Sequence, residues 1–441
     1  MSIYNFILFF KERAHRFLPI SVRAIIHVVR WIKFTEYRLN NSFISPSHLF
    51  YIGYTKKITF IIYPFLFLIR KYCLRNKIYI SVNNIPFAIG HLYPEIDYLL
   101  RVLSVDDKYK DEKFLYIYPK NNMLDELSTI FSGDNFKIIQ SGVLHMLFYF
   151  AALKFKEIRV DCSLSSNAYH KSGGLDNHKH VFEGKFRRYA ELYRKSSEYY
   201  PLSKFGKENP MPEDLIELIG PGKYAVIQIK DVAANATWKV VDPNTYNSAI
   251  LILKEMGYRV VLAGREEMPN NFKSLGVINY SESKYASPLN DYHIVYNSSL
   301  VISSASGFSL MADLLDKPLL MLNIWQLSNC IGRRTIFIPT IILNKNKKMN
   351  FQDQYKFFID LDGVNSKGLS SYQKEMYRAT DAKEKDIELA LLELIKTCLH
   401  KECIPRTPLQ LYYNSLFPRT WTSSGLSRIS DDFLRSNMEL L

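Results

Sequence analysis

The sequence predicts an α/β protein in which two doubly wound, mostly parallel domains face a cleft, with a basic helical arm before them and a helical tail after them. Short apolar segments alternate with helical segments twice along the chain, and a polar stretch rich in Ser, His, Tyr, Lys and Gly separates the two series. Positive charge is concentrated ahead of the first series. At 441 residues the chain is long enough to form two such domains.

The predicted arm covers residues 1–76. Residues 1–75 contain twelve Lys or Arg and two Glu, which accounts for +10 of the net charge of +14. Apolar side chains recur at helical spacing over residues 21–38, with Arg and Lys beside the apolar stripe. The apolar run at 58–69 is shorter than the roughly 20 residues of a membrane span, so it is either a buried core helix or a surface segment.

We expect the arm to dock on an anionic membrane surface, anchored by Trp31, Tyr63 and Phe65, with the protein cytoplasmic and peripheral at the inner face of the membrane. Nucleic acid is the other partner that a basic arm suggests, but no nucleic-acid module accompanies it, so we expect no nucleic-acid partner. The five cysteines have no CxxC spacing, which fits a reducing compartment and no metal site.

The first predicted domain, residues 77–165, alternates strands with helices. Its strands are expected at residues 77–82, 113–119, 136–140 and 157–160, and its helices at 96–103, 122–131 and 144–154. Residues 166–222 form the predicted connector, with one helix near 183–199 and prolines that punctuate its end.

The second predicted domain, residues 223–403, repeats the alternation. Its strands are expected at residues 223–230, 259–264, 276–280, 300–302, 318–322 and 335–340, and its helices at 244–256, 308–315 and 381–403. Residues 404–441 form the tail, which ends in a short capped helix. The sequence contains neither GxGxxG nor GxxxxGK[ST], which disfavours a dinucleotide or P-loop site.

A serine-rich segment follows one strand of the second domain where the next helix begins. Small side chains at this point let a phosphate approach the backbone, where the free N–H groups and the positive end of the helix bind it. The residues that we expect to contact the phosphate are Ser304, Ser306, Gly307, Phe308 and Ser309. Asp313 lies on the same helix and can accept hydrogen bonds from a ribose diol. The alternative is that the serines only cap the helix and that Asp313 is solvated.

Six short motifs occur in order along the chain. They are GHLYPE at 90–95, QIKD at 228–231, GYRVVLAGR at 257–265, YASPLND at 285–291, SSASGFS at 303–309 and ISDDFL at 429–434. With these motifs, about residues 77–441 resemble a family of bacterial GT-B glycosyltransferases associated with surface-polysaccharide loci, such as those for O-antigen and capsule. Gln228 and Lys230 stand where that family has His and Arg.

The resemblance implies two Rossmann-like domains, of which the second binds a nucleotide-sugar donor and the first an acceptor. Lys230 and Arg265 follow strands of the second domain and are placed to bind the diphosphate without a metal. Their alternative role is surface ion pairing, with Asp231 or Glu266. Tyr285 is expected to stack on the nucleotide base, with Tyr280 as the alternative.

Glycosyl transfer by inversion needs a base that takes a proton from the acceptor hydroxyl. His91 and Glu95 are four residues apart, so a helix that begins before His91 places them on one face. We expect one of them to be the base and the other to orient it or to bind the acceptor. The alternative for His91 is a capping or packed histidine.

The sequence therefore predicts a metal-independent, inverting glycosyltransferase that needs no cofactor. It would move a sugar from a nucleotide-sugar donor to a glycan or glycolipid acceptor, either lipid-linked or a nascent surface polysaccharide. Two alternatives stay open: a noncatalytic nucleotide- or glycan-binding scaffold of the same fold, and a sugar-nucleotide epimerase.

Overall fold

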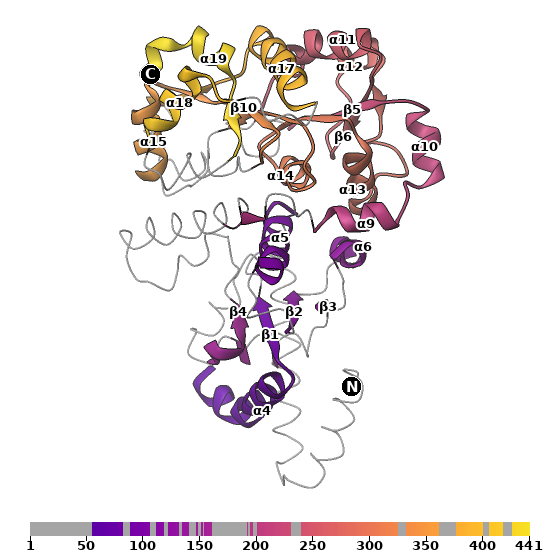
Figure 1. Ribbon diagram of the computed structural model, residues 1–441, viewed down its shortest axis with the longest axis vertical. Helices are drawn as coiled ribbons and strands as arrows, with labels where there is room; N and C mark the ends of the chain where they lie inside the picture. The colour runs from indigo at the N-terminus through magenta and orange to yellow at the C-terminus, as the bar shows by residue number, and fades with distance from the viewer. Residues whose placement is uncertain are drawn as a thin grey trace. The chain divides into compact units, whose positions relative to one another are not determined.

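The computed structural model describes residues 55–82, 89–105, 112–118, 122–131, 135–140, 147–148, 151–152, 154–160, 192, 195–196, 201–230, 240–324, 332–360, 376–399, 405–417 and 426–441. The helix expected at 21–38 and the anchor Trp31 lie outside these residues, as does most of the predicted connector. The chain divides into two compact units (Figure 1). One comprises Met1–Val82, Leu115–Lys120 and Ile139–Val160, and the other comprises Asn83–Phe114, Asn121–Ile138 and Asp161–Leu441.

The first unit contains most of a four-stranded sheet of order β3-β2-β1-β4, in which β1 and β4 run parallel. The strands are β1 (Ile78–Val82), β2 (Lys113–Tyr118), β3 (Phe136–Gln140) and β4 (Arg159–Val160). Helix α4 (Thr55–Arg75) packs against β1 and against the short 3-10 helix η2 (Lys156–Ile158). Within the described residues, no helix combines the length and the apolarity that crossing a bilayer requires.

The second unit contains a seven-stranded sheet of order β14-β10-β9-β8-β5-β6-β7, and every neighbouring pair in it is parallel. Its strands are β5 (Tyr224–Gln228), β6 (Arg259–Ala263), β7 (Ile278–Asn279), β8 (Leu300–Ser304), β9 (Leu319–Ile324), β10 (Thr335–Pro339) and β14 (Arg428–Ile429). The residues of β5, β8, β9 and β10 are all buried, as expected for parallel strands covered on both faces. The predicted α/β class is confirmed.

Helices cover both faces of this sheet. Figure 1 shows α11, α12 and α17 on one side of the strands and α13 and α14 on the other. These helices are α11 (Asn247–Glu255), α12 (Asn270–Ser274), α13 (Pro288–Asn297), α14 (Gly307–Leu314) and α17 (Glu384–Cys398). Helices α5 (Ile89–Val105) and α6 (Asn122–Phe131) also belong to the second unit, where α5 packs against α14 and α6 against α13.

Several shorter elements complete the second unit. They are α9 (Ser203–Glu208), α10 (Glu213–Ile219), η6 (Pro243–Tyr246), β11 (Ile341–Asn344), β12 (Lys347–Lys348), α15 (Phe351–Asp360), β13 (Tyr377–Thr380), α18 (Pro408–Ser415), α19 (Asp431–Ser436) and η9 (Met438–Leu440). Strands β12, β11 and β13 form a separate antiparallel sheet.

The predicted C-terminal tail contributes a strand as well as helices. Its residues 428–429 form β14, which pairs with β10 at the edge of the large sheet. Ser430 then caps α19 by accepting a hydrogen bond from the backbone N–H of Phe433, and Phe433 and Leu434 are buried. The ISDDFL motif is therefore accounted for as a strand, a helix cap and a packed helix.

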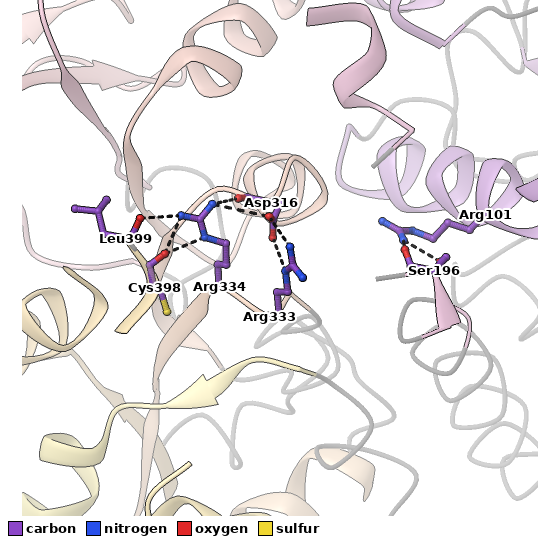
Figure 2. A network of polar contacts seen from close by, with 7 residues as sticks. All are labelled: Arg101, Ser196, Asp316, Arg333, Arg334, Cys398 and Leu399. Atoms are coloured by element: carbon purple, nitrogen blue, oxygen red, sulfur yellow. Dashed lines mark hydrogen bonds and ion pairs between the residues drawn. The ribbon is translucent and has the colours of Figure 1, made fainter. Parts of the chain in front are cut away.

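Two buried or half-buried arginines fix chain segments that are far apart in sequence (Figure 2). The Arg334 guanidinium donates to the carbonyl oxygens of Cys398 (2.8 and 2.9 Å) and Asp316 (2.9 Å), so it neutralises the carboxyl end of α17. On α5, the fully buried Arg101 pairs with Asp97 at 2.6 Å and donates to the carbonyl oxygen of Ser196 at 2.8 Å. The second contact ties α5 to a residue of the predicted connector.

Candidate functional site

The large sheet has one topological switch point. The chain runs outward from β5 through β6 and β7, returns to the other side of β5, and runs outward again through β8, β9 and β10. Open parallel sheets bind ligands beyond the carboxyl ends of their strands where the strand order reverses in this way. In this chain the reversal lies between β5 and β8, whose last residues include the paired Gln228 and Ser303.

Gln228 organises the loop that follows β8. Its Oε1 atom accepts hydrogen bonds from Ser303 Oγ at 2.7 Å and from Ser306 Oγ at 2.9 Å, while its Nε2 donates to the carbonyl oxygen of Ile229. Gly264 lies beside it with φ of +109°, and a Cβ atom at this glycine would stand 3.2 Å from Gln228 Cγ. Gln228 therefore holds the serine-rich loop on β5, a role that sequence analysis did not assign to it.

The loop ends in a capping box at the start of α14. The backbone N–H of Ser306 donates to Ser309 Oγ at 3.0 Å, and the N–H of Ser309 donates to Ser306 Oγ at 3.3 Å. Both hydroxyls are thus occupied within the loop. The next two residues, Gly307 and Phe308, are partly exposed, and among the described residues no acceptor is recorded for the backbone N–H of either. Unsatisfied amides at a helix start form an anion-binding site.

Two cationic side chains follow the neighbouring strands at the same edge. Lys230 lies two residues beyond β5 and is partly exposed, and within the part of the chain that the structure describes it forms no recorded ion pair. Arg265 lies two residues beyond β6 and is exposed, and its backbone N–H donates to Glu266 Oε2 at 3.0 Å. The alternative partner Asp231 lies outside the described residues. Among the described residues, the switch point therefore combines amides that have no recorded acceptor with nearby positive charge.

The two tyrosines considered for base stacking differ in exposure. Tyr280 is fully buried, and its hydroxyl lies between the backbone N–H and carbonyl groups of Ser287, at 3.2 and 3.3 Å. Burial excludes Tyr280 as a stacking surface. Tyr285 is partly exposed, with the Lys284 ammonium 4.9 Å from its ring centre, so it stays available for a base.

Asp291, the last residue of the YASPLND motif, lies one turn into α13. Its Oδ1 atom is buried and has no hydrogen-bond partner among the described residues. Burial raises the pKa of the Asp291 carboxyl to about 7, and this effect is opposed by a hydrogen bond with Tyr280 and by attraction to Arg265. Glu126, which accepts a hydrogen bond from the N–H of Leu289 at 3.4 Å, raises it further. Asp291 is thus poised between its two protonation states near neutral pH.

Asp313 has a structural role rather than the predicted contact with ribose. Its carboxylate is 2% exposed, and it accepts hydrogen bonds from the backbone N–H of Gly332 at 2.9 Å and from the Thr335 hydroxyl. Ser304, the last residue of β8, is also fully buried. The side chains of Asp313 and Ser304 therefore present no surface to a nucleotide.

The two candidates for the base lie at the start of α5. Ile89–Val105 forms one continuous helix, so His91 and Glu95 are separated by about one turn, but their side chains lie outside the described residues. Helix α5 packs against α14, whose start carries the free amides (Figure 1). Within the described residues, no three His, Cys, Asp or Glu side chains are grouped as metal ligands.

Comparisons with known proteins gave likeness at the level of structure only. No family model and no curated protein matches the sequence. The chain is similar to the E. coli heptosyltransferase WaaC with ADP (14% identity, 64% of this chain and 99% of that chain covered, TM-score 0.38). It is also similar to the dodecameric iron-containing glycosyltransferase TibC from enterotoxigenic E. coli (13%, 74% and 76%, 0.42) and to the UDP-GlcNAc 2-epimerase from Methanocaldococcus jannaschii (9%, 72% and 99%, 0.32). At these TM-scores the likeness carries no argument, so the candidate site rests on strand order and on the contacts described above.

Proposed function

We propose that the protein is a glycosyltransferase that binds the diphosphate of a nucleotide-sugar at the start of α14. One observation carries the proposal: within the described residues the amides of Gly307 and Phe308 have no recorded acceptor, and they lie at the switch point of a parallel sheet. A diphosphate supplies the anionic oxygens that such amides bind, and the helix dipole favours it further.

The reaction that we propose needs no metal ion. A hydroxyl of the acceptor attacks the anomeric carbon, the bond to the diphosphate breaks, and the nucleoside diphosphate leaves with both electrons of that bond. Lys230 and Arg265 stabilise the charge that develops on the leaving oxygen, together with the two amides. His91 or Glu95 takes the proton of the attacking hydroxyl, and the single displacement inverts the configuration of the anomeric carbon.

The acceptor is proposed to be a lipid-linked or nascent surface glycan, as the family resemblance implies. In this proposal Tyr285, which follows the end of β7 in the chain, contacts the nucleotide base. Gln228 does not touch the ligand in this account. It holds Ser303 and Ser306 so that the loop presents its backbone to the phosphates.

The test compares nucleotide-sugar hydrolysis and sugar transfer by Ser306→Trp and Arg265→Ala with two controls on the exposed surface of α12, Ser274→Trp and Lys273→Ala. Loss of a preorganised anion contact is expected to lower turnover by about 10²–10³-fold in the first pair, with the controls unchanged. Analysis of the products separates transfer from epimerisation. Unchanged turnover in both site variants would contradict the donor-site assignment.

A further inference from the structure

Helix α4 has a buried face and an exposed face of different chemistry. Leu66, Ile69 and Cys73 are almost fully buried and form the face that packs on the four-stranded sheet. The opposite face leaves large apolar side chains in solvent. They are Tyr63 (40% exposed), Leu68 (48%) and Leu74 (45%). Spacings of three, four and seven residues place these side chains, with Phe67 and Lys71, on one stripe of the helix.

Basic side chains are interleaved with this apolar stripe. Lys71 and Arg75 are exposed on it, and the Lys71 ammonium lies 5.2 Å from the centre of the Phe67 ring. Arg70 lies between the rings of Phe67 (5.7 Å) and Phe155 (5.4 Å) and pairs with Glu157 at 2.5 Å. Lys154 extends the surface beyond the helix, because its ammonium stands 5.9 Å from the Tyr63 ring. We call Tyr63, Phe67, Leu68, Lys71, Leu74 and Arg75 the α4 face.

The charge around the α4 face is mostly positive, and Glu157, which pairs with Arg70, is an acidic side chain beside it. Residues 37–94 contain no Asp or Glu, and residues 55–82 contain six Lys or Arg. Half-exposed apolar side chains next to snorkelling cations match the boundary between the headgroups and the acyl chains of an anionic bilayer, where the apolar groups are buried and the cations meet phosphates. A nucleic acid would use the charge but would leave Leu68 and Leu74 in water.

We propose that the α4 face is a docking surface for an anionic lipid bilayer, with the helix lying in the interface rather than crossing it. Leu68, Leu74 and Tyr63 enter the headgroup layer, and Lys71 and Arg75 contact lipid phosphates. The buried face of α4 keeps its contacts with the sheet, so docking needs no unfolding of the unit. This proposal does not depend on the chemistry at the switch point.

The test is co-sedimentation of the full chain with vesicles of phosphatidylcholine mixed with phosphatidylglycerol, and with vesicles of phosphatidylcholine alone. Two double variants probe the α4 face: Leu68→Ser with Leu74→Ser, and Lys71→Glu with Arg75→Glu. Leu251→Ser with Leu392→Ser is the matched apolar control, since these leucines are 47% and 43% exposed on α11 and α17. Lys207→Glu with Lys273→Glu is the matched charge control, at two exposed lysines of the second unit.

We expect the wild-type chain to bind the anionic vesicles more tightly than the neutral ones, and each α4 variant to lose at least about tenfold in partitioning. Both controls should partition as the wild type does, and hydrolysis of a soluble nucleotide-sugar should be the same in all variants. Equal partitioning of the α4 variants and the wild type would overturn the proposal, as would a wild-type chain that binds neither vesicle. If Ser306→Trp and Arg265→Ala lost hydrolysis but bound the anionic vesicles as the wild type does, the docking proposal would still hold.

Discussion

In the switch-point region, the Asp291 carboxyl is a group whose protonation changes near neutral pH. Tyr280 and Arg265 favour its charged form, but burial outweighs them and raises its pKa from 3.8 to about 7. Between these two pH values the Asp291 carboxyl keeps its proton in the folded chain and loses it in the unfolded chain. The stability that Asp291 contributes is therefore fully present below about pH 4 and is lost as the pH rises through about 7.

Asp291→Asn should remove this dependence, because an amide does not titrate. We expect the free energy of unfolding of the variant to rise relative to the wild type between about pH 5 and about pH 8. Urea unfolding of both proteins at the two pH values measures it, with the exposed Asp353→Asn as control. Parallel changes in wild type and Asp291→Asn would show that the carboxyl does not titrate in this range.

At the scale of elements, α14 is fixed at both of its ends. The capping box and Gln228 hold its start on β8 and β5, and Asp313 ties its last turn to Gly332 and to Thr335, the first residue of β10. The glycine is required by this contact, since a Cβ atom at Gly332 would lie 1.8 Å from Asp313 Oδ1. The helix that carries the proposed phosphate site is thereby held without a ligand.

Asp313→Ala is expected to lower the free energy of unfolding by about 1–3 kcal/mol, because the buried Gly332 amide and Thr335 hydroxyl lose their acceptor. Gly332→Ala should destabilise the protein by displacing the same carboxylate. Denaturant unfolding measures both, and Asp353→Ala on the exposed surface of α15 is the control. If Asp313→Ala kept its stability and lost only nucleotide affinity, the ribose contact expected from the sequence would be the better account.

The elements that sequence analysis found are those whose signal is local. Residues 259–264 and 335–340 were expected as strands and match β6 and β10 closely, because runs of buried branched side chains between turn residues are visible in the sequence. Strand β14 was missed because two residues in a polar tail become a strand only through pairing with β10. Its partner is about ninety residues away in the sequence.

The residues of the candidate site also divide into those with a local signal in the sequence and those whose role depends on distant residues. Ser306, Gly307 and Phe308 could be placed at a helix start, because small residues between an apolar strand and a helical run are a local pattern. Whether a polar side chain there faces solvent or protein is decided by distant residues. Asp313 is buried by the segment that contains Gly332, and Gln228 acquires its role from β8, which is more than seventy residues further along the chain. No periodicity in the sequence reports those contacts.

At the scale of the whole molecule, the strand order of the large sheet is the feature on which the proposed function depends. It places the ends of β5, β6 and β8 at one edge, so a serine-rich loop, Lys230 and Arg265 come from three separate segments to the same edge. The α4 face belongs to the other unit, and its chemistry suits a bilayer. The two proposals together describe a protein that takes a soluble activated sugar and works at a membrane surface.

The most direct measurement is the thermal unfolding of the full chain with a series of nucleoside diphosphates and nucleotide-sugars of uridine, guanosine and cytidine, and with CMP-sugars. A ligand of the folded state at about a hundredfold its Kd stabilises it by about 2.7 kcal/mol. At least one of these ligands should therefore raise the Tm of the wild type, and the same ligand should leave the Tm of Ser306→Trp unchanged. A wild type that responds to none of them, or a Ser306→Trp variant that responds equally, would contradict a nucleotide-sugar site at the start of α14.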